Sequence, residues 1–155
     1  MIFLTVGTQV PFDRLVRVVD EWAGKTGREV FGQIGHGDYV PRHMLCVPSL
    51  DPSAYQERFA AAQAVIAHAG MGTILTALQH AKPLVVMPRR ASLGEHRNEH
   101  QLATARRFRE RGLVRVAMDA SELLDHLERV DDWAPLGKIG ASASSELLDT
   151  IRRFL

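Results

Sequence analysis

The chain has 155 residues, of which 46% are hydrophobic and 24% are charged, and its formal net charge is +1. This length suits a single domain with its own core, and the composition excludes a disordered or fibrous protein. The near-neutral charge gives no reason to expect a nucleic-acid partner. The lone cysteine, Cys46, lies in the apolar stretch MLCVPS and predicts a buried thiol in a reducing compartment. The apolar start MIFLTVGT has no basic residue and suits a core strand better than a signal peptide, so we expect a cytoplasmic protein.

In the first part of the chain, continuous apolar runs alternate with stretches in which apolar residues recur at the spacing of a helix. The run MIFLTV before Gly7 predicts a buried strand, and the apolar residues within 12–23 recur at the spacing of a helix. Short strands are expected within 28–35 and 43–49. A helix is expected after Asp51, because aspartate favours the N-cap position.

The same alternation continues to the C-terminus. The later expected elements are a strand in QAVIAHAG, a helix over 74–81, a strand in PLVVMP, a helix over 98–111 that stops at Gly112, a strand in LVRVA, a helix around 123–127 and a helix over 147–155. We expect the stretch 131–145 to be irregular. Strands that alternate with helices predict an α/β fold, namely a single Rossmann-like domain over residues 1–155 with a parallel sheet and helices on both faces.

In such a sheet the carboxyl ends of the strands meet at one edge, where ligands bind, so the candidate loops follow Val6, Ala67 and Met87. Two of them, GTQVPF and HAGMGT, place small residues just before a helix, where N–H groups and the helix dipole favour an anion such as a diphosphate. Neither is a Walker A or G-x-G-x-x-G motif, which disfavours a nucleoside triphosphatase or a dinucleotide dehydrogenase. The alternative is that Gly70 and Gly72 only let the helix pack closely on the sheet.

The third loop, PRRASLGEHRNEHQ, is dense in charged and polar side chains. Carboxylate, amide and imidazole groups at the ligand edge suit sugar hydroxyls, although such a run is also typical of a solvated surface. Arg89 or Arg90 could pair with a uronate carboxylate, but we expect both to be unpaired surface arginines. His96 and His100 are four residues apart without the glutamate of H-E-x-x-H, so no metal site is predicted.

These motifs together resemble a known family. HAGMGT, followed by KP, MP and NEHQ, resembles the C-terminal, donor-binding half of GT-B glycosyltransferases of family 28, of which MurG is a two-domain member. The opening FLTVGTQVPFDRLV is similar to stand-alone members of that family, namely the exopolysaccharide subunit PssE and the soluble subunit of the dolichol-linked N-acetylglucosamine transferase. The resemblance, which extends to about Val116, implies a metal-independent, inverting transfer from a UDP-sugar without a cofactor.

The resemblance also implies roles for individual residues. The residues implied at the diphosphate are Gly7, Thr8, His68, Gly70, Met71, Gly72 and Thr73. Those implied at the donor sugar are Asn98, Glu99, His100 and Gln101, and Leu50 would lie against the uracil. Glu95 and His96 are candidate catalytic residues, because their loop could reach a cleft between two domains. Thr76 stands where many GT-B enzymes carry a glutamate for the ribose hydroxyls, so ribose recognition is expected to differ.

A GT-B active site lies between two domains, and the resemblance covers only the donor-binding one. It therefore implies a membrane-anchored, PssD-like partner that supplies the general base and presents a polyprenyl-diphosphate-linked saccharide. The protein would then lie at the inner face of the membrane through this partner and act in exopolysaccharide synthesis. The apolar stripe over 147–155 is either a docking surface or part of the core, and a homo-oligomer stays open.

Two other functions remain as alternatives. One is a non-catalytic nucleotide-sugar-binding or scaffolding subunit that regulates another transferase. The other is a UDP-sugar epimerase, which would share the nucleotide site but work alone. Product analysis with the isolated chain separates the epimerase from the other two.

Overall fold

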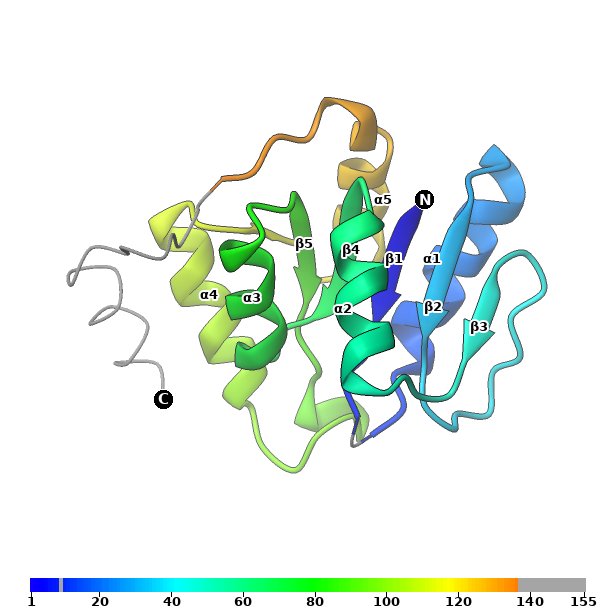
Figure 1. The fold of residues 1–155 in the computed structure, drawn as a ribbon. Coiled ribbons are helices and arrows are strands. Elements are labelled where there is room, and N and C mark those ends of the chain that lie inside the picture. Colours follow the sequence, from blue (N-terminus) through cyan, green and yellow to red (C-terminus); the bar gives the residue numbers. More distant parts are fainter. Residues whose placement is uncertain (9, 137–155) are drawn as a thin grey trace.

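A computed structural model describes residues 1–8 and 10–136 of the chain. Within them, parallel strands form one sheet in the order β3-β2-β1-β4-β5-β6. The strands are β1 (Ile2–Thr5), β2 (Val30–Gln33), β3 (Leu45–Val47), β4 (Ala64–His68), β5 (Leu84–Met87) and β6 (Arg115–Val116). The helices are α1 (Asp13–Thr26), α2 (Pro52–Ala61), α3 (Met71–Gln79), α4 (His100–Arg111) and α5 (Ala120–Leu127). This arrangement confirms the predicted Rossmann-like α/β fold (Figure 1).

The sheet is covered by helices on both faces (Figure 1). Helices α1 and α5 pack on one face, where residues such as Val19 and Leu123 join one apolar cluster. Helices α2, α3 and α4 pack on the other face and contribute Phe59, Ile74 and Phe108 to a second cluster. The central strand β1 is buried along its whole length and feeds both clusters, which explains why it reads as a continuous apolar run.

Several predicted helix ends are confirmed. The Asp51 carboxylate accepts a hydrogen bond from the Ala54 N–H at 2.8 Å, so Asp51 caps α2 as expected. Gly112 ends α4 with a φ of 65°. The predicted start of α4 at residue 98 is two residues early, because the Asn98 side chain accepts a hydrogen bond from the His100 N–H and forms a local turn.

The remaining expectations are met in part. Strands β2, β3 and β6 lie within the predicted stretches but are shorter than them. A short 3₁₀ turn, Val130–Asp132, begins just before the stretch expected to be irregular. The predicted helix over 147–155, and with it the candidate docking surface, lies outside the described residues.

A buried carboxylate fixes the connection between β2 and β3. Asp20 on α1 is fully buried and accepts hydrogen bonds from the Tyr39 hydroxyl at 2.7 Å and from the N–H groups of Arg42 and His43. Burial alone would raise its pKa, but these hydrogen bonds hold the pKa of Asp20 below its usual value. The carboxylate therefore ties a strand-free segment to the first helix.

Other features of the described chain bear on function. Cys46 is half-buried, and burial raises the pKa of its thiol to about 11, so a reactive thiolate is not expected there. Across 1–8 and 10–136, no helix is long and apolar enough to cross a membrane. The same residues contain no group of three or more histidine, cysteine or acidic side chains that could hold a metal ion.

Candidate functional site

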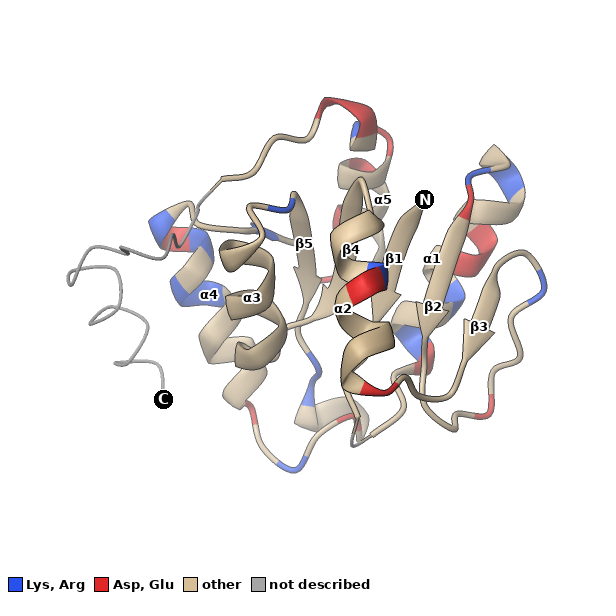
Figure 2. Cartoon of the chain, in the orientation of Figure 1, with Lys and Arg blue, Asp and Glu red and all other residues tan. Residues whose placement is uncertain are grey.

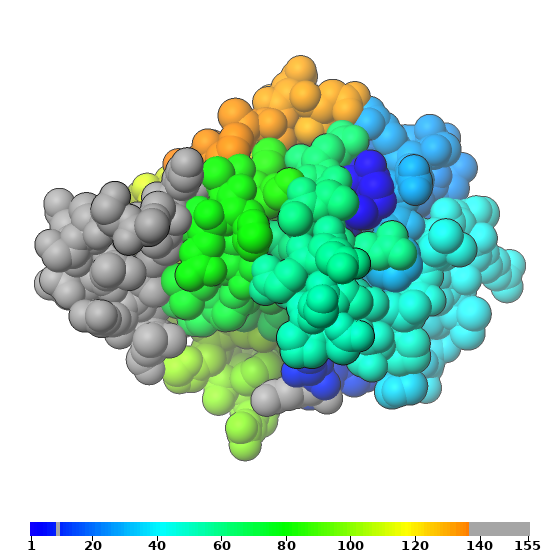
Figure 3. Space-filling model, in the orientation of Figure 1, coloured from blue at the N-terminus to red at the C-terminus, as the bar shows by residue number. Residues whose placement is uncertain are grey.

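The carboxyl ends of the central strands border a cavity of about 430 Å³. It is lined by Val6, Gly7, Thr8, Val10, Gln33, Tyr55, His68, Gly70, Gly72, Thr73, Thr76, Arg89, His96 and Gln101. At this edge the β1–α1 loop, in blue, lies next to the loop before α4, in yellow-green (Figure 3). The three loops that the sequence singled out therefore meet around one cavity.

The ring of His68, the last residue of β4, lies between the first two loops. A Cβ atom on Gly7 would lie 2.9 Å from His68 Nε2, and one on Gly70 would lie 2.2 Å from His68 Cε1. Glycine is therefore needed at both positions for the ring to fit. Gly72 differs, because an added Cβ there would meet no atom within 4 Å among residues 1–8 and 10–136. The close-packing role, the alternative considered for both glycines, thus fits Gly70, whereas Gly72 opens onto free space.

A chain of hydrogen bonds fixes the protonation state of His68. The Arg89 N–H donates to Gln101 Oε1 at 3.1 Å, so the Gln101 amide nitrogen donates to His68 Nδ1 at 3.2 Å. The remaining ring proton is then on Nε2, which lies 3.4 Å from Thr73 Oγ1. Burial, assisted by the Arg89 charge, lowers the pKa of His68 to about 3. His68 is therefore a neutral donor toward Thr73, whose side chain also hydrogen-bonds with the Tyr55 hydroxyl.

Helix α3 opens onto the cavity with its N-terminus. Gly70 is the N-cap and provides no side chain to cap the helix. The first intrahelical bond runs from Ile74 N to Gly70 O, so the N–H groups of the first turn have no carbonyl of their own helix to bond. No acidic residue lies in that turn, and Figure 2 colours no residue of α3 as charged. Gly72 and Thr73 lie on the cavity wall, and free N–H groups at a helix N-terminus are an arrangement that favours an anion.

At Thr76, the position expected to face the ribose, the hydroxyl already has a hydrogen-bond partner. Thr76 lines the cavity, and its Oγ1 donates to the Gly72 carbonyl at 2.9 Å. Only the lone pairs of this oxygen are left for a ligand. A carboxylate at the same place would accept two hydrogen bonds, so the departure noted in the sequence persists in the structure.

The expectation that Arg89 and Arg90 are unpaired surface residues is wrong. Arg89 is only 3% exposed, and its Nη2 donates to the carbonyl oxygen of Val6 at 2.6 Å and to that of Val10. Arg90 donates from Nη2 to the Met118 carbonyl at 2.9 Å. Both side chains satisfy backbone carbonyls across the sheet edge, which a local charge count could not reveal.

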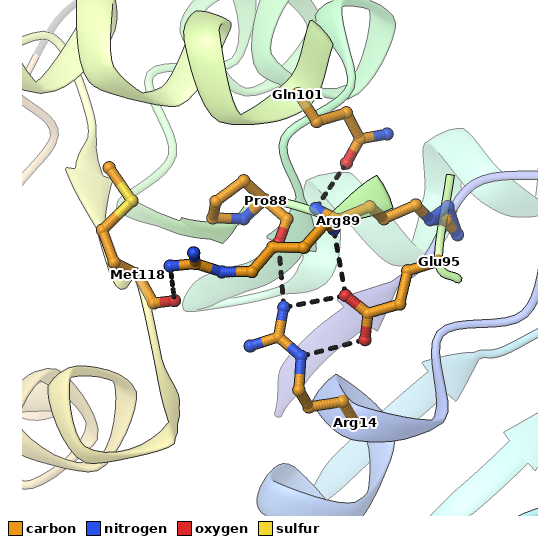
Figure 4. A network of polar contacts seen from close by, with 7 residues as sticks. Arg14, Pro88, Arg89, Glu95, Gln101 and Met118 are labelled. Carbon is orange, nitrogen blue, oxygen red and sulfur yellow. Dashed lines mark hydrogen bonds and ion pairs between the residues drawn. The ribbon is translucent and has the colours of Figure 1, made fainter. Parts of the chain in front are cut away.

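Glu95 has partners of its own outside the cavity lining. Its carboxylate accepts from Arg14 Nε and Nη2, each at 2.9 Å, and from the Arg90 N–H at 3.0 Å. Arg14 also donates to the Pro88 carbonyl at 3.1 Å, so α1 is tied to the loop after β5 (Figure 4). A catalytic role for Glu95 stays a prediction, and in this structure the carboxylate holds the loop in place.

The other candidates from the third loop are divided between two surfaces. His96 and Gln101 line the cavity, and His96 Nδ1 accepts from the Asn98 N–H at 3.3 Å. Glu99 and His100 instead line a separate hollow of about 370 Å³, and Glu99 accepts from the Ser92 N–H. Contacts of Glu99, His100 and Asn98 with a donor sugar remain a prediction.

Leu50 and Met71, two of the predicted site residues, lie in apolar surroundings. Both are partly buried and pack against the cluster beneath α2, α3 and α4. Neither lines the cavity, so a contact of Leu50 with uracil is untested.

Three polar residues of the cavity lining were not among the site residues expected from the sequence. Gln33 is buried and accepts from the Thr5 hydroxyl at 2.7 Å. Tyr55 on α2 packs edge-on against Phe3, with ring centroids 5.6 Å apart, and burial raises the pKa of its hydroxyl. Arg89 is the third. Gln33 had a detectable signal, because a polar residue ends an otherwise apolar strand at the ligand edge.

The fold and the site define a Rossmann-like domain with a helix N-terminus that opens onto a cavity at the carboxyl edge of its sheet. Residues 1–135 match the glycosyltransferase family 28 C-terminal domain, and the chain belongs to that family.

Known proteins resemble the chain in sequence and in structure. Over 90 residues it is 38% identical to UDP-N-acetylglucosamine transferase subunit ALG13 of Eremothecium gossypii, covering 56% of this chain and 42% of that protein. The NMR solution structure of ALG13 has a TM-score of 0.61 at 20% identity, covering 87% of this chain and 88% of that one. The crystal structure of Acinetobacter baumannii MurG has a TM-score of 0.60 at 16% identity, covering 97% of this chain and 49% of that one. These structural likenesses show the fold, and the chain spans less than half the length of the curated relative.

Proposed function

We infer that this chain binds the UDP-sugar donor of a glycosyltransferase. The observation that carries the proposal is the first turn of α3, where N–H groups and the open position at Gly72 face a cavity of about 430 Å³. Membership of family 28 and the likeness to a subunit named as a UDP-N-acetylglucosamine transferase support a uridine nucleotide as the ligand.

The geometry suits stabilisation of a leaving nucleoside diphosphate. When the bond between the sugar and the diphosphate breaks, negative charge grows on the diphosphate oxygens. The N–H groups of the first turn of α3 and the helix dipole are fixed at the cavity before a ligand binds and need no reorganisation, and Thr73 also lines the cavity. We therefore propose that transfer proceeds without a metal ion or cofactor.

We further propose that the transferase has two components. The residues that line the cavity surround the proposed position of the donor. An acceptor needs a second protein surface that faces the donor. A membrane-anchored partner of the PssD type would provide this surface, the general base and the lipid-diphosphate-linked saccharide. The chain would then lie at the cytoplasmic face of the membrane in exopolysaccharide synthesis, and transfer would require both subunits.

Variants at Gly72 test the donor site. Because the position is open, Gly72→Asp and Gly72→Asn should both fold, and they differ only in charge. At distances of 4 to 6 Å a carboxylate opposes a diphosphate by about 1 to 4 kcal/mol, so we expect UDP to bind Gly72→Asp roughly tenfold to a thousandfold more weakly than Gly72→Asn. Titration calorimetry with UDP measures the difference.

The control for size is Gly72→Ala, which adds one uncharged methyl group at the same position and separates the effect of filling the space from the effect of the charge. Equal affinities of the Asp and Asn variants would place the phosphates away from α3. Absence of any heat with the wild-type chain and UDP would count against the proposed function itself.

A further inference from the structure

We propose that Arg89 is the buried cation that a bound nucleoside diphosphate neutralises, and that its guanidinium also holds the β1–α1 loop against that ligand. This inference rests on the proposed function and assigns a positioning role to a residue outside the glycine loops. Arg89 acts through its charge and through the loop it holds.

The guanidinium of Arg89 lies beneath the first loop. Its Nη2 donates to the carbonyl oxygens of Val6, where that loop begins, and of Val10, within it. The central carbon of the guanidinium lies 5.1 Å from the centre of the Phe12 ring. These contacts close the loop around the cavity, which Arg89 itself lines. The shape of the loop beside the anion site therefore depends on this side chain.

The charge of Arg89 lacks a counter-ion in the described chain. Within residues 1–8 and 10–136, no carboxylate forms an ion pair with it, and its buried Nε has no hydrogen-bond partner. Glu95 is close enough to favour the charged form, but its oxygens bond Arg14 and Arg90. Burial therefore lowers the pKa of Arg89 to about 10, which still leaves it charged at neutral pH.

A buried cation without a partner is unfavourable, since desolvation is not offset by a nearby opposite charge. A diphosphate at the N-terminus of α3 would supply that charge to the same cavity. The helix N-terminus and the uncompensated arginine point independently to an anion. They also predict that the affinity gain from Arg89 increases with the number of phosphate charges on the ligand.

The test compares UDP with UMP, which share the nucleoside and differ by one phosphate. Arg89→Gln keeps a polar side chain and removes the charge, while Arg89→Lys keeps the charge but cannot bridge two carbonyls as a planar fork does. In Arg89→Gln we expect the affinity for UDP to fall about tenfold more than that for UMP. In Arg89→Lys the affinities for UDP and UMP should fall by the same factor, so that their ratio stays that of the wild type.

The matched control is Arg90→Gln, because Arg90 bonds the Met118 carbonyl and does not line the cavity. Its affinities for both nucleotides should equal those of the wild type. If Arg89→Gln is unfolded by circular dichroism, the wild-type chain gives the readout instead: the Arg89 Nε–H resonance should shift on saturation with UDP and much less with UMP.

Equal losses of UDP and UMP affinity in Arg89→Gln, or an Arg89 resonance that responds alike to both nucleotides, would overturn the proposal while leaving the nucleotide site intact. A wild-type chain that binds neither nucleotide would overturn the proposed function, and this inference with it.

Discussion

At the scale of single residues, His68 has the most constrained chemistry in the site. Its ring fits only because glycines stand at positions 7 and 70, and Gln101 sets which ring nitrogen carries the proton. Since burial keeps it neutral, His68 supplies a fixed hydrogen bond to Thr73 and no charge. The positive potential of the cavity then comes from Arg89 and the helix dipole.

The neutral state of His68 predicts a pH-dependent stability. Its pKa is about 3 in the folded chain, against roughly 6.5 when unfolded, so between these values the unfolded state binds more protons. The contribution of neutral His68 to the free energy of unfolding is complete above about pH 6.5. It is lost as the pH falls below that value, by up to about 1.4 kcal/mol per pH unit. Urea unfolding at intervals from about pH 7.5 to 5 measures this slope, above the range in which most carboxylates titrate.

The control is His68→Gln, which removes the titrating group and should show a shallower fall in the free energy of unfolding over the same interval. If wild type and variant lose stability in parallel, His68 titrates normally in the folded chain and the buried hydrogen-bond chain is wrong.

The residues of the site could be predicted where a motif is contiguous. HAGMGT reveals His68 and the N-terminus of α3 because a glycine-rich turn between a strand and a helix has a local signature. Gln33 enters the site only because β2 pairs with β1 in a register that sets it beside Thr5. The sequence suggested a surface position for Arg89, because its hydrogen-bond partners are the carbonyl oxygens of Val6 and Val10, far from it in the sequence.

At the scale of elements, the ion pair between Arg14 and Glu95 ties α1 to the loop that carries His96. The side chains are 24% and 13% exposed, and each has a further hydrogen bond to the backbone. Such a network fixes a loop more firmly than an isolated surface pair, because little of it is screened by water.

We therefore expect Glu95→Gln to lower the free energy of unfolding by roughly 1 to 3 kcal/mol, since it leaves the Arg14 guanidinium without its bidentate partner. The matched control is Asp131→Asn, which breaks the exposed pair with Arg28, whose side chains are 35% and 61% exposed. That change should be close to neutral. Chemical denaturation of the two variants compares them, and an equal effect would show that the loop is not held by this pair.

The elements themselves followed largely from the sequence. Apolar periodicity placed the helices and strands, and residues such as Asp51 and Gly112 marked where helices begin or end. The start of α4 was misplaced because the side chain of Asn98 competes for the backbone of the first turn. The short strands β3 and β6 end where sheet pairing ends, which depends on neighbouring strands and not on local pattern.

At the scale of the whole molecule, the fold places the loops after β1, β4 and β5 at one edge of the sheet. Parallel strands with right-handed crossovers bring every carboxyl end to the same side, so loops far apart in the sequence become neighbours. The class of fold could be predicted from alternation alone. The ligand that the cavity accepts could not be predicted in this way, because it depends on residues from three loops and from β2, α2, β4, α3 and α4.

The central claim is that a uridine diphosphate binds where α3 meets the first loop, and amide chemical-shift mapping of the ¹⁵N-labelled chain tests it most directly. On titration with UDP, the largest shifts should fall on the N–H groups of Gly7, Gly70, Gly72 and Thr73. The resonances of the N–H groups around the hollow between α1 and the β2–β3 connection, which is lined by residues such as Asp38 and Arg42, should hardly shift. Shifts that cluster around that hollow instead, or none at any UDP concentration, would contradict the account.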